Sequence, residues 1–119
     1  MKSESEAHLL RIFIGESDQH QGRPLYEVIV EAARKRGLAG ATVLRGVLGF
    51  GANSRIHTSK ILRLSEDLPV VIEIVDRPDR IGGFLPELDS WIGEGLITLE
   101  KVRIVAYRHN GSQNPDSSS

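Results

Sequence analysis

The sequence predicts an α+β domain in which the elements follow the order strand, helix, strand, strand, helix, strand. Apolar residues recur at strand spacing in four segments and at helical spacing in two others. The chain has 119 residues, of which 39% are hydrophobic, so it can form one compact core but not two. Two of the predicted strands are apolar on both alternations, which is typical of a sheet covered on both faces.

The first strand and first helix are marked by a change of period. Leu9 to Ile14 is dense in β-branched and large apolar residues, and Gly15 ends this predicted strand. Between Pro24 and Gly37 the apolar residues fall at helical spacing. Pro24 suits the first helical turn and Gly37 suits the C-terminal cap, so a helix is predicted between them.

The middle of the chain contains two more predicted strands. Ala41 to Phe50 is interrupted by Gly46 and Gly49, which indicate a bend or a close approach of the backbone. After a polar stretch, residues 61–64 fit a short strand or a strand extension. Pro69 to Val75 is predicted as the third strand because it is rich in β-branched residues.

The second helix opens at Arg77-Pro78-Asp79 and ends at Gly93 and Gly95. Its apolar residues follow the three-four repeat of a helix packed on one face, at Ile81, Phe84, Leu85, Leu88, Trp91 and Ile92. Val102, Ile104 and Ala106 alternate with Lys101, Arg103 and Val105, which predicts the last strand at Val102 to Tyr107.

This order is the split β-α-β repeat of ferredoxin-like folds, with an antiparallel four-stranded sheet and two helices on one face. The helices can cover only one side of the sheet. The first strand nevertheless places Leu9 and Phe13 on one face and Leu10, Ile12 and Ile14 on the other. We therefore expect the second face to be buried in a homo-oligomer with closed cyclic symmetry.

The composition limits the function classes. The predicted domain spans residues 8–109, with flexible tails at 1–7 and 110–119. Fifteen Lys and Arg residues against 16 Asp and Glu give a net charge of -1, which argues against nucleic-acid binding. Cysteine is absent, and neither a bilayer-length apolar run nor a signal-peptide start occurs. We expect a cytoplasmic protein without direct membrane insertion.

Catalytic and metal-binding patterns are weak in this sequence. No Gly-x-Ser-x-Gly motif occurs, and acidic pairs lie at element boundaries, where helix capping is their ordinary role. The four histidines do not have the spacing of metal ligands; they are His8, His20, His57 and His109. We therefore expect no enzymatic activity and no metal site.

Two glycine pairs are the best candidates for a ligand site. Gly49-Phe50-Gly51 leads into a polar loop that carries Asn53, Arg55 and Lys60, and Gly93-Glu94-Gly95 separates the second helix from the last strand. Backbone amides freed by glycine could bind phosphate together with Arg and Lys. The simpler alternatives are a solvated surface loop for the first pair and a helix stop for the second.

These segments resemble a known family. Ala41-Thr42-Val43 followed by Gly49-Phe50-Gly51 resembles the segment that enters the T-loop of PII nitrogen-signalling proteins. The whole core from Leu9 to Arg108 is similar to the PII-like family named domain of unknown function 190. The most specific segments of that similarity are Arg23-Pro24-Leu25-Tyr26-Glu27, residues 44–51, and Phe84-Leu85-Pro86-Glu87-Leu88.

The resemblance implies a homotrimer with nucleotide-binding clefts between subunits. By position, Gly49, Phe50, Gly51 and Asn53 correspond to the base of the T-loop, Gly93 to Gly95 to the B-loop, and Arg103 or Arg108 to the basic end of the site. In PII proteins such clefts bind adenine nucleotides, so ATP, ADP or AMP is the expected effector. Leu96 stands where PII proteins have a B-loop lysine.

Three functions are compatible with the sequence. The leading hypothesis is a trimeric sensor in which an anionic effector orders the loop from Gly51 to Lys60, which then contacts a target protein. The second is an adaptor that binds a membrane channel or transporter without a ligand, with a role in ion tolerance. The third, divalent-metal binding as in CutA proteins of similar fold, has the least support.

Overall fold

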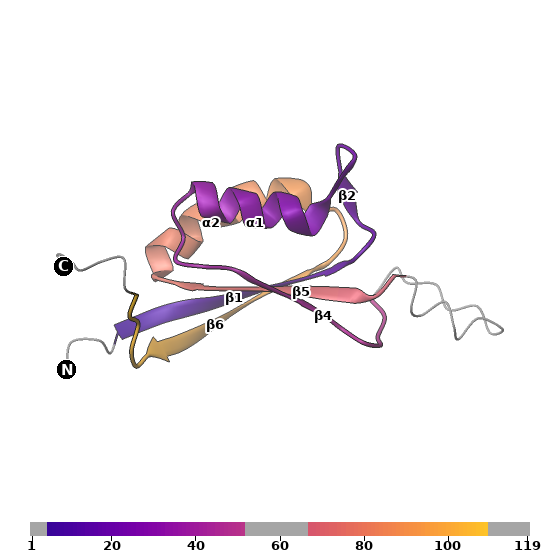
Figure 1. Ribbon diagram of the computed structural model, residues 1–119. Coiled ribbons are helices and arrows are strands. Elements are labelled where there is room, and N and C mark those ends of the chain that lie inside the picture. The colour runs from indigo at the N-terminus through magenta and orange to yellow at the C-terminus, as the bar shows by residue number, and fades with distance from the viewer. Residues whose placement is uncertain (1–4, 52–66, 110–119) are drawn as a thin grey trace.

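The predicted ferredoxin-like α+β fold is confirmed by the computed structural model, which describes residues 5–51 and 67–109. A four-stranded antiparallel sheet has the strand order β4-β5-β1-β6. Its strands are β1 (Ser5–Gly15), β4 (Thr42–Arg45), β5 (Pro69–Asp76) and β6 (Leu96–Ile104). Helices α1 (Leu25–Lys35) and α2 (Pro78–Trp91) lie side by side on one face of the sheet (Figure 1).

The core lies between the helices and the two central strands. Alternate residues of β1 and β5 point toward the helices and are buried, which explains the dense apolar pattern of both strands. Each helix contributes residues three or four positions apart, as a helix packed on one face requires. The cluster contains Leu10, Ile12, Ile14, Leu25, Ile29, Ala33, Leu38, Val70, Ile72, Ile74, Ile81, Phe84 and Leu88.

The end of α1 follows the predicted glycine cap. Gly37 has φ +78° and donates its N–H to the carbonyl of Arg34 at 3.0 Å, while Leu38 donates to the carbonyl of Ala33 at 3.1 Å. This pair of bonds is the Schellman motif, in which a left-handed residue turns the chain back over the last helical turn. The turn buries Leu38 against the core.

The start of β1 and the end of β4 differ from the sequence-based expectations. β1 begins at Ser5 and Ala7 is buried, so residues 5–7, which were expected in a flexible tail, belong to the sheet. The second strand, expected to reach Phe50, ends at Arg45, and the backbone after it passes close to the ring of Pro69 at Gly46 and Gly49. The extension expected at residues 61–64 lies outside the described residues.

The last strand was expected at Val102 to Tyr107; the strand is present, but both of these bounds are wrong. β6 starts at Leu96 and ends at Ile104, paired along its whole length with β1. The alternation of apolar residues indicates only part of this strand. Its length is determined by nine successive residue pairs with β1.

A hairpin between β1 and α1 was not predicted. Strands β2 (Gln19–His20) and β3 (Arg23–Pro24) are joined by Gln21 and Gly22, which both have positive φ. Positive φ at both turn residues matches the right-handed twist of short hairpins. The ring of His20 lies 6.1 Å from that of Trp91, so the hairpin packs against the end of α2. None of the described helices is long and apolar enough to cross a membrane.

Candidate functional site

The first glycine segment is Gly49 to Gly51, and the backbone that leads into it from Gly46 passes over the ring of Pro69. Gly46 donates its N–H to the Pro69 carbonyl at 2.8 Å, which extends the β4 pairing by one residue. A Cβ atom would lie 2.9 Å from Pro69 Cγ at Gly46 and 3.0 Å from it at Gly49. Both glycines are therefore required by the close passage of the backbone over the proline. A Cβ at Gly51, in contrast, would meet no atom within 4 Å.

In the second glycine segment, Gly93 to Gly95, one glycine is again required by the packing and the other is not. Gly95 has φ +154°, and a Cβ there would lie 2.8 Å from the carbonyl oxygen of Phe13. Gly95 is therefore required for β6 to begin beside β1. A Cβ at Gly93 would meet no atom within 4 Å, and its φ is not positive. The fold explains Gly95, while it leaves Gly93 and Gly51 open to another role.

We expect Gly95→Ala to destabilise the protein by about 1–3 kcal/mol, because the new methyl group meets the β1 backbone at a disfavoured φ. The matched control is Gly93→Ala, which should change the free energy of unfolding by less than about 0.5 kcal/mol. Urea denaturation of both variants checks this. Equal losses would show that the two positions do not differ in their packing.

The two glycine segments lie at the same end of the sheet but on opposite edges. Arg45 is paired with Val70, and Phe13 is paired with Leu96, so β5 and β1 separate the end of β4 from the start of β6. Three strand spacings place the edges about 14 Å apart. One chain therefore does not bring Gly49 to Gly51 into contact with Gly93 to Gly95.

The apolar residues beside the first glycine segment are exposed. Val47 is 92% exposed, Leu48 is 67% exposed and Phe50 is 69% exposed. Three large apolar side chains within four residues form a surface suited to protein contact. Asn53, Arg55 and Lys60, which the sequence placed in the same site, lie outside the described residues.

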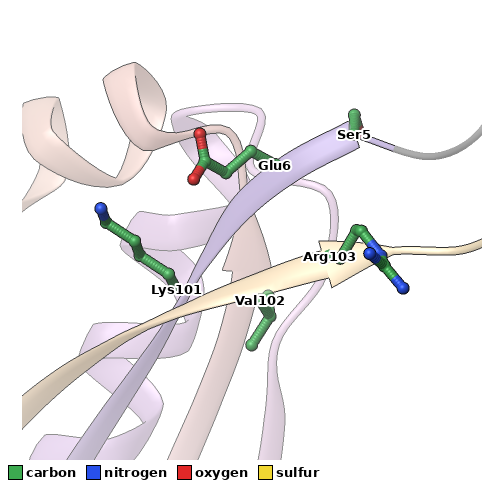
Figure 2. A pocket seen from close by; sticks show the side chains of 5 residues that line it. All are labelled: Ser5, Glu6, Lys101, Val102 and Arg103. Carbon is green, nitrogen blue, oxygen red and sulfur yellow. The ribbon is translucent and has the colours of Figure 1, made fainter.

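Arg103 lies at the other end of β6, opposite Glu6 of β1. A shallow groove of about 490 Å³ is found there, lined by Ser5, Glu6, Lys101, Val102 and Arg103. In Figure 2, Lys101 and Glu6 project to the same side of the two strands, while Val102 projects to the other side. Arg108 follows four residues after the end of β6 and is exposed. The strand rise places Arg103 about 27 Å from Gly95.

The sheet face away from the helices, which we call the open face, is largely apolar. Leu9 and Phe13 of β1 and Val71 and Val75 of β5 point to it, since their neighbours in each strand point to the helices. At the edges, Leu44 of β4 lies beside Val71 and Leu96 of β6 lies beside Phe13, and both are about half exposed. A patch of this kind on one face of a sheet marks an interaction surface.

Three charged side chains meet near the middle of the open face, where Arg11 is paired with Glu73 and Thr98 while Glu100 lies opposite Leu9, the next residue of β1 on this face. Arg11 donates from Nε to Glu73 at 2.9 Å and from Nη1 to Glu100 at 3.1 Å. The hydrogen bond to Glu73 raises the pKa of Arg11 further above its ordinary value, with a smaller contribution from Glu100. We call Glu73, Arg11 and Glu100 the charged cluster. Sequence reasoning did not select these residues, although each of Arg11 and Glu73 is the single charge in an apolar run.

The histidines do not form a metal site in the parts of the chain that the structure describes. No group of three or more His, Cys, Asp or Glu side chains is positioned to hold a metal ion there. His8 lies in β1 and His20 packs on Trp91, while His57 is outside the described residues.

Residues 7–104 match the family model DUF190, described as "Uncharacterized ACR, COG1993". A UPF0166 protein of Aquifex aeolicus is 43% identical over 97 residues, which are 82% of this chain and 91% of the relative. A UPF0166 protein of Methanocaldococcus jannaschii is 37% identical over 100 residues, with 83% of this chain and 92% of the relative covered.

Solved structures with the same fold are PII-like proteins. One from Thermus thermophilus, described as a PII-like signalling protein, has a TM-score of 0.61 at 17% identity, with 87% of this chain and 93% of that chain covered. CPII of Thiomonas intermedia K12, a nitrogen regulatory PII-like protein, was solved bound to ADP, AMP and bicarbonate. It has a TM-score of 0.56 at 13% identity, with 85% and 97% coverage. These similarities show a shared fold.

Proposed function

The chain belongs to the DUF190 family, and from its PII-like fold we propose that it is a cytoplasmic regulatory protein rather than an enzyme. It would act as a homotrimer that binds a small anionic effector, such as an adenine nucleotide, in clefts between subunits. The loop after β4 would then contact a target protein. CPII, which shares the fold and binds ADP and AMP, supports the class of effector.

The position of the two glycine segments is the observation that carries this proposal. They lie at the same end of the sheet on opposite edges, and each contains one glycine that the fold does not require, Gly51 and Gly93. Rotation about an axis parallel to the strands brings the β4 edge of one copy beside the β6 edge of the next. A cleft formed in this way would contain both segments, one from each chain.

The chemistry of such a cleft suits an anion. Glycine lets the backbone approach a ligand closely, and successive backbone N–H groups can form a concave site for phosphate oxygens. Arg55 and Lys60 are proposed to supply the positive charge, with Asn53 as a further donor. Phe50 could stack on a base, since its ring is mostly exposed. The carboxylate of Glu94 would contact a ribose hydroxyl.

Arg103 and Arg108 are assigned a separate contact in this proposal. Because Arg103 is about 27 Å from Gly95 of the same chain, the two residues cannot bind the same phosphate group. We propose that Arg103 and Arg108 bind a second anionic group at the far end of the inter-subunit groove, beside Lys101.

Calorimetric titration of the full chain with ATP, ADP and AMP tests the nucleotide proposal. We expect saturable heat with at least one nucleotide and at least a tenfold loss of affinity in Gly93→Val, whose side chain would fill the cleft. Gly82→Val is the matched control, because a Cβ at Gly82 also meets no atom within 4 Å but lies on the outer face of α2. Absence of heat at millimolar nucleotide would contradict the proposal.

The exposed apolar side chains of Val47, Leu48 and Phe50 also favour a second function. In this alternative, the protein is a ligand-independent adaptor of a membrane channel or transporter. Pull-down of the target would then be unchanged after nucleotide removal and in the Arg55→Ala and Lys60→Ala variants. A nucleotide-dependent yield would favour the sensor instead.

A further inference from the structure

Lysine and arginine side chains gather at the end of the molecule that lies opposite to the two glycine segments. β1 runs from Ser5 at this end to Gly15 at the glycine end, and its 11 residues span about 33 Å. We call the first of these the basic end and the second the glycine end. The cations of the basic end come from the end of α1, the start of α2, and the end of β6 with the segment after it: Arg34, Lys35, Arg36, Arg77, Arg80, Lys101, Arg103 and Arg108.

Contacts between the elements join these cations into one surface. Arg80 donates a hydrogen bond from Nη1 to the carbonyl of Gly37, so the end of α1 packs beside the start of α2. α2 follows β5 directly, and Asp76 at the end of β5 is paired with His8 of β1. His8 is paired on its other side with Lys101 of β6, about 10 Å from the end of β5. Figure 1 shows the end of α1, the start of α2 and the end of β6 toward the same end of the sheet.

The fold accounts for only part of this charge. Cations are favoured at the C-terminal end of a helix by its dipole, which explains Arg34, Lys35 and Arg36. The dipole opposes Arg77, because this residue is the N-cap of α2, where an anion is favoured. Lys101 lies in a strand and has no ion pair among the described residues. A requirement beyond helix stability is therefore needed for the full set.

The two ends of the molecule differ in charge. The carboxylates at the basic end are fewer than its cations; they are Glu6, Asp76, Asp79 and Glu87. Carboxylates prevail at the glycine end, where Asp18 and Asp67 accept the backbone N–H groups of Gly15 and Ser17. Glu16 and Glu94 also lie there. A chain with a net charge of -1 thus has one positive end and one negative end.

The shape and chemistry of the basic end fit a broad anionic surface with an apolar layer beneath it. The cations of the two helices do not line the groove at this end, which is bounded by residues of β1 and β6. Val105 and Tyr107 follow β6 directly and are 58% and 60% exposed. Cations beside exposed apolar and tyrosine side chains suit the headgroup region of a bilayer. A nucleic-acid duplex would contact the cations but offer no apolar layer to these side chains.

We propose that the basic end docks on an anionic lipid surface. Its cations contact the lipid headgroups, and Val105 and Tyr107 lie at the level of the headgroups. The acidic glycine end then faces away from the bilayer, because anionic lipids repel it. In the proposed homotrimer, an axis parallel to the strands directs three basic ends toward one plane, which strengthens binding to a flat surface. Only this multivalency rests on the proposed function.

Cosedimentation of the full chain with lipid vesicles tests the proposal. The wild type should bind vesicles of phosphatidylcholine that contain phosphatidylserine, but not vesicles of phosphatidylcholine alone. Raising the salt concentration from about 0.1 M to about 1 M shortens the Debye length from about 10 Å to about 3 Å, so it should release the protein.

Two double variants with the same net charge locate the contact. Arg34→Gln with Lys35→Gln removes two exposed cations of the basic end that lie outside the proposed effector site. Vesicle binding of this variant should be on the order of 20-fold weaker. Arg23→Gln with Arg45→Gln is the matched control, because it removes two cations near the glycine end, where they pair with Glu31 and Glu16. The control should bind vesicles like the wild type.

Three outcomes would overturn the proposal. The first is absence of wild-type binding to phosphatidylserine vesicles at low salt, and the second is equal binding by the two double variants. The third is tighter binding to duplex DNA than to vesicles, lost in Arg34→Gln with Lys35→Gln, which would show nucleic acid as the partner. Calorimetry with nucleotide separates this proposal from the proposed function. Nucleotide binding without vesicle binding would leave the proposed function standing, and vesicle binding without nucleotide heat would leave the lipid proposal standing.

Discussion

Phe84→Ala is expected to lower the free energy of unfolding by about 3–5 kcal/mol. The ring of Phe84 is fully buried between α2 and the sheet, so its removal leaves a cavity that the packed strands cannot close. Chemical denaturation at a fixed protein concentration measures this loss. The concentration is held constant because self-association would itself add to the apparent stability.

The two other phenylalanines of the chain are matched controls for the same change. Phe50→Ala should change the free energy of unfolding by less than about 0.5 kcal/mol, because the ring is exposed, and should weaken effector or target binding instead. Phe13→Ala should mainly raise the concentration at which the proposed oligomer dissociates, because Phe13 lies on the open face. A similar loss of stability in all three variants would contradict the assignment of Phe84 to the core, Phe13 to the open face and Phe50 to the exposed segment after β4.

Asp76→Ala is expected to cost about 2–5 kcal/mol of unfolding free energy. Asp76 is only 8% exposed, and its carboxylate accepts the N–H of Ala39 at 2.9 Å and that of Arg77 at 2.7 Å. The first bond holds the segment before β4, and the second holds the start of α2. Its removal leaves two backbone donors without their acceptor, and each such group costs about 1–3 kcal/mol when buried.

Asp79→Ala is the control for loss of a nearby carboxylate. Asp79 is exposed, and its pKa is lowered chiefly by the hydrogen bond from Arg77, to which it is joined at 2.7 Å. Removal of this surface pair should leave the thermal midpoint almost unchanged, since surface ion pairs contribute little. Thermal denaturation followed by circular dichroism compares the two variants. An equal drop in the thermal midpoint of Asp79→Ala would show that negative charge near the start of α2, rather than the two hydrogen bonds of Asp76, stabilises this part of the fold.

Most of the fold could be predicted from local patterns. The helical spacing of Leu25, Ile29 and Ala33 and the cap at Gly37 identify α1 because both depend on residues close in sequence. The start of β6 at Leu96 was not predicted, because its pairing with Phe13 joins residues far apart in the chain. The hairpin at Gln21 and Gly22 was missed because its strands are only two residues long and carry no alternation.

The candidate site could be predicted only in part. Both glycine segments were identified, but the sequence does not distinguish the glycines that the backbone requires from those that it does not. Gly95 is required by the carbonyl of Phe13, a residue from the distant first strand that only tertiary folding brings close. The charged cluster was missed for the same reason, since Arg11, Glu73 and Glu100 come from three separate strands.

The sequence alone determined the fold class, the two helices and the family to which the chain belongs, because these depend on periodicity and on motifs that are local in the chain. Only the tertiary structure decided which segments of the chain are neighbours in space. It separated the two glycine segments onto opposite edges of the sheet and joined Arg11 to two glutamates on the open face. The physical reason is that strand order and register arise from the packing of distant segments, which local patterns do not encode.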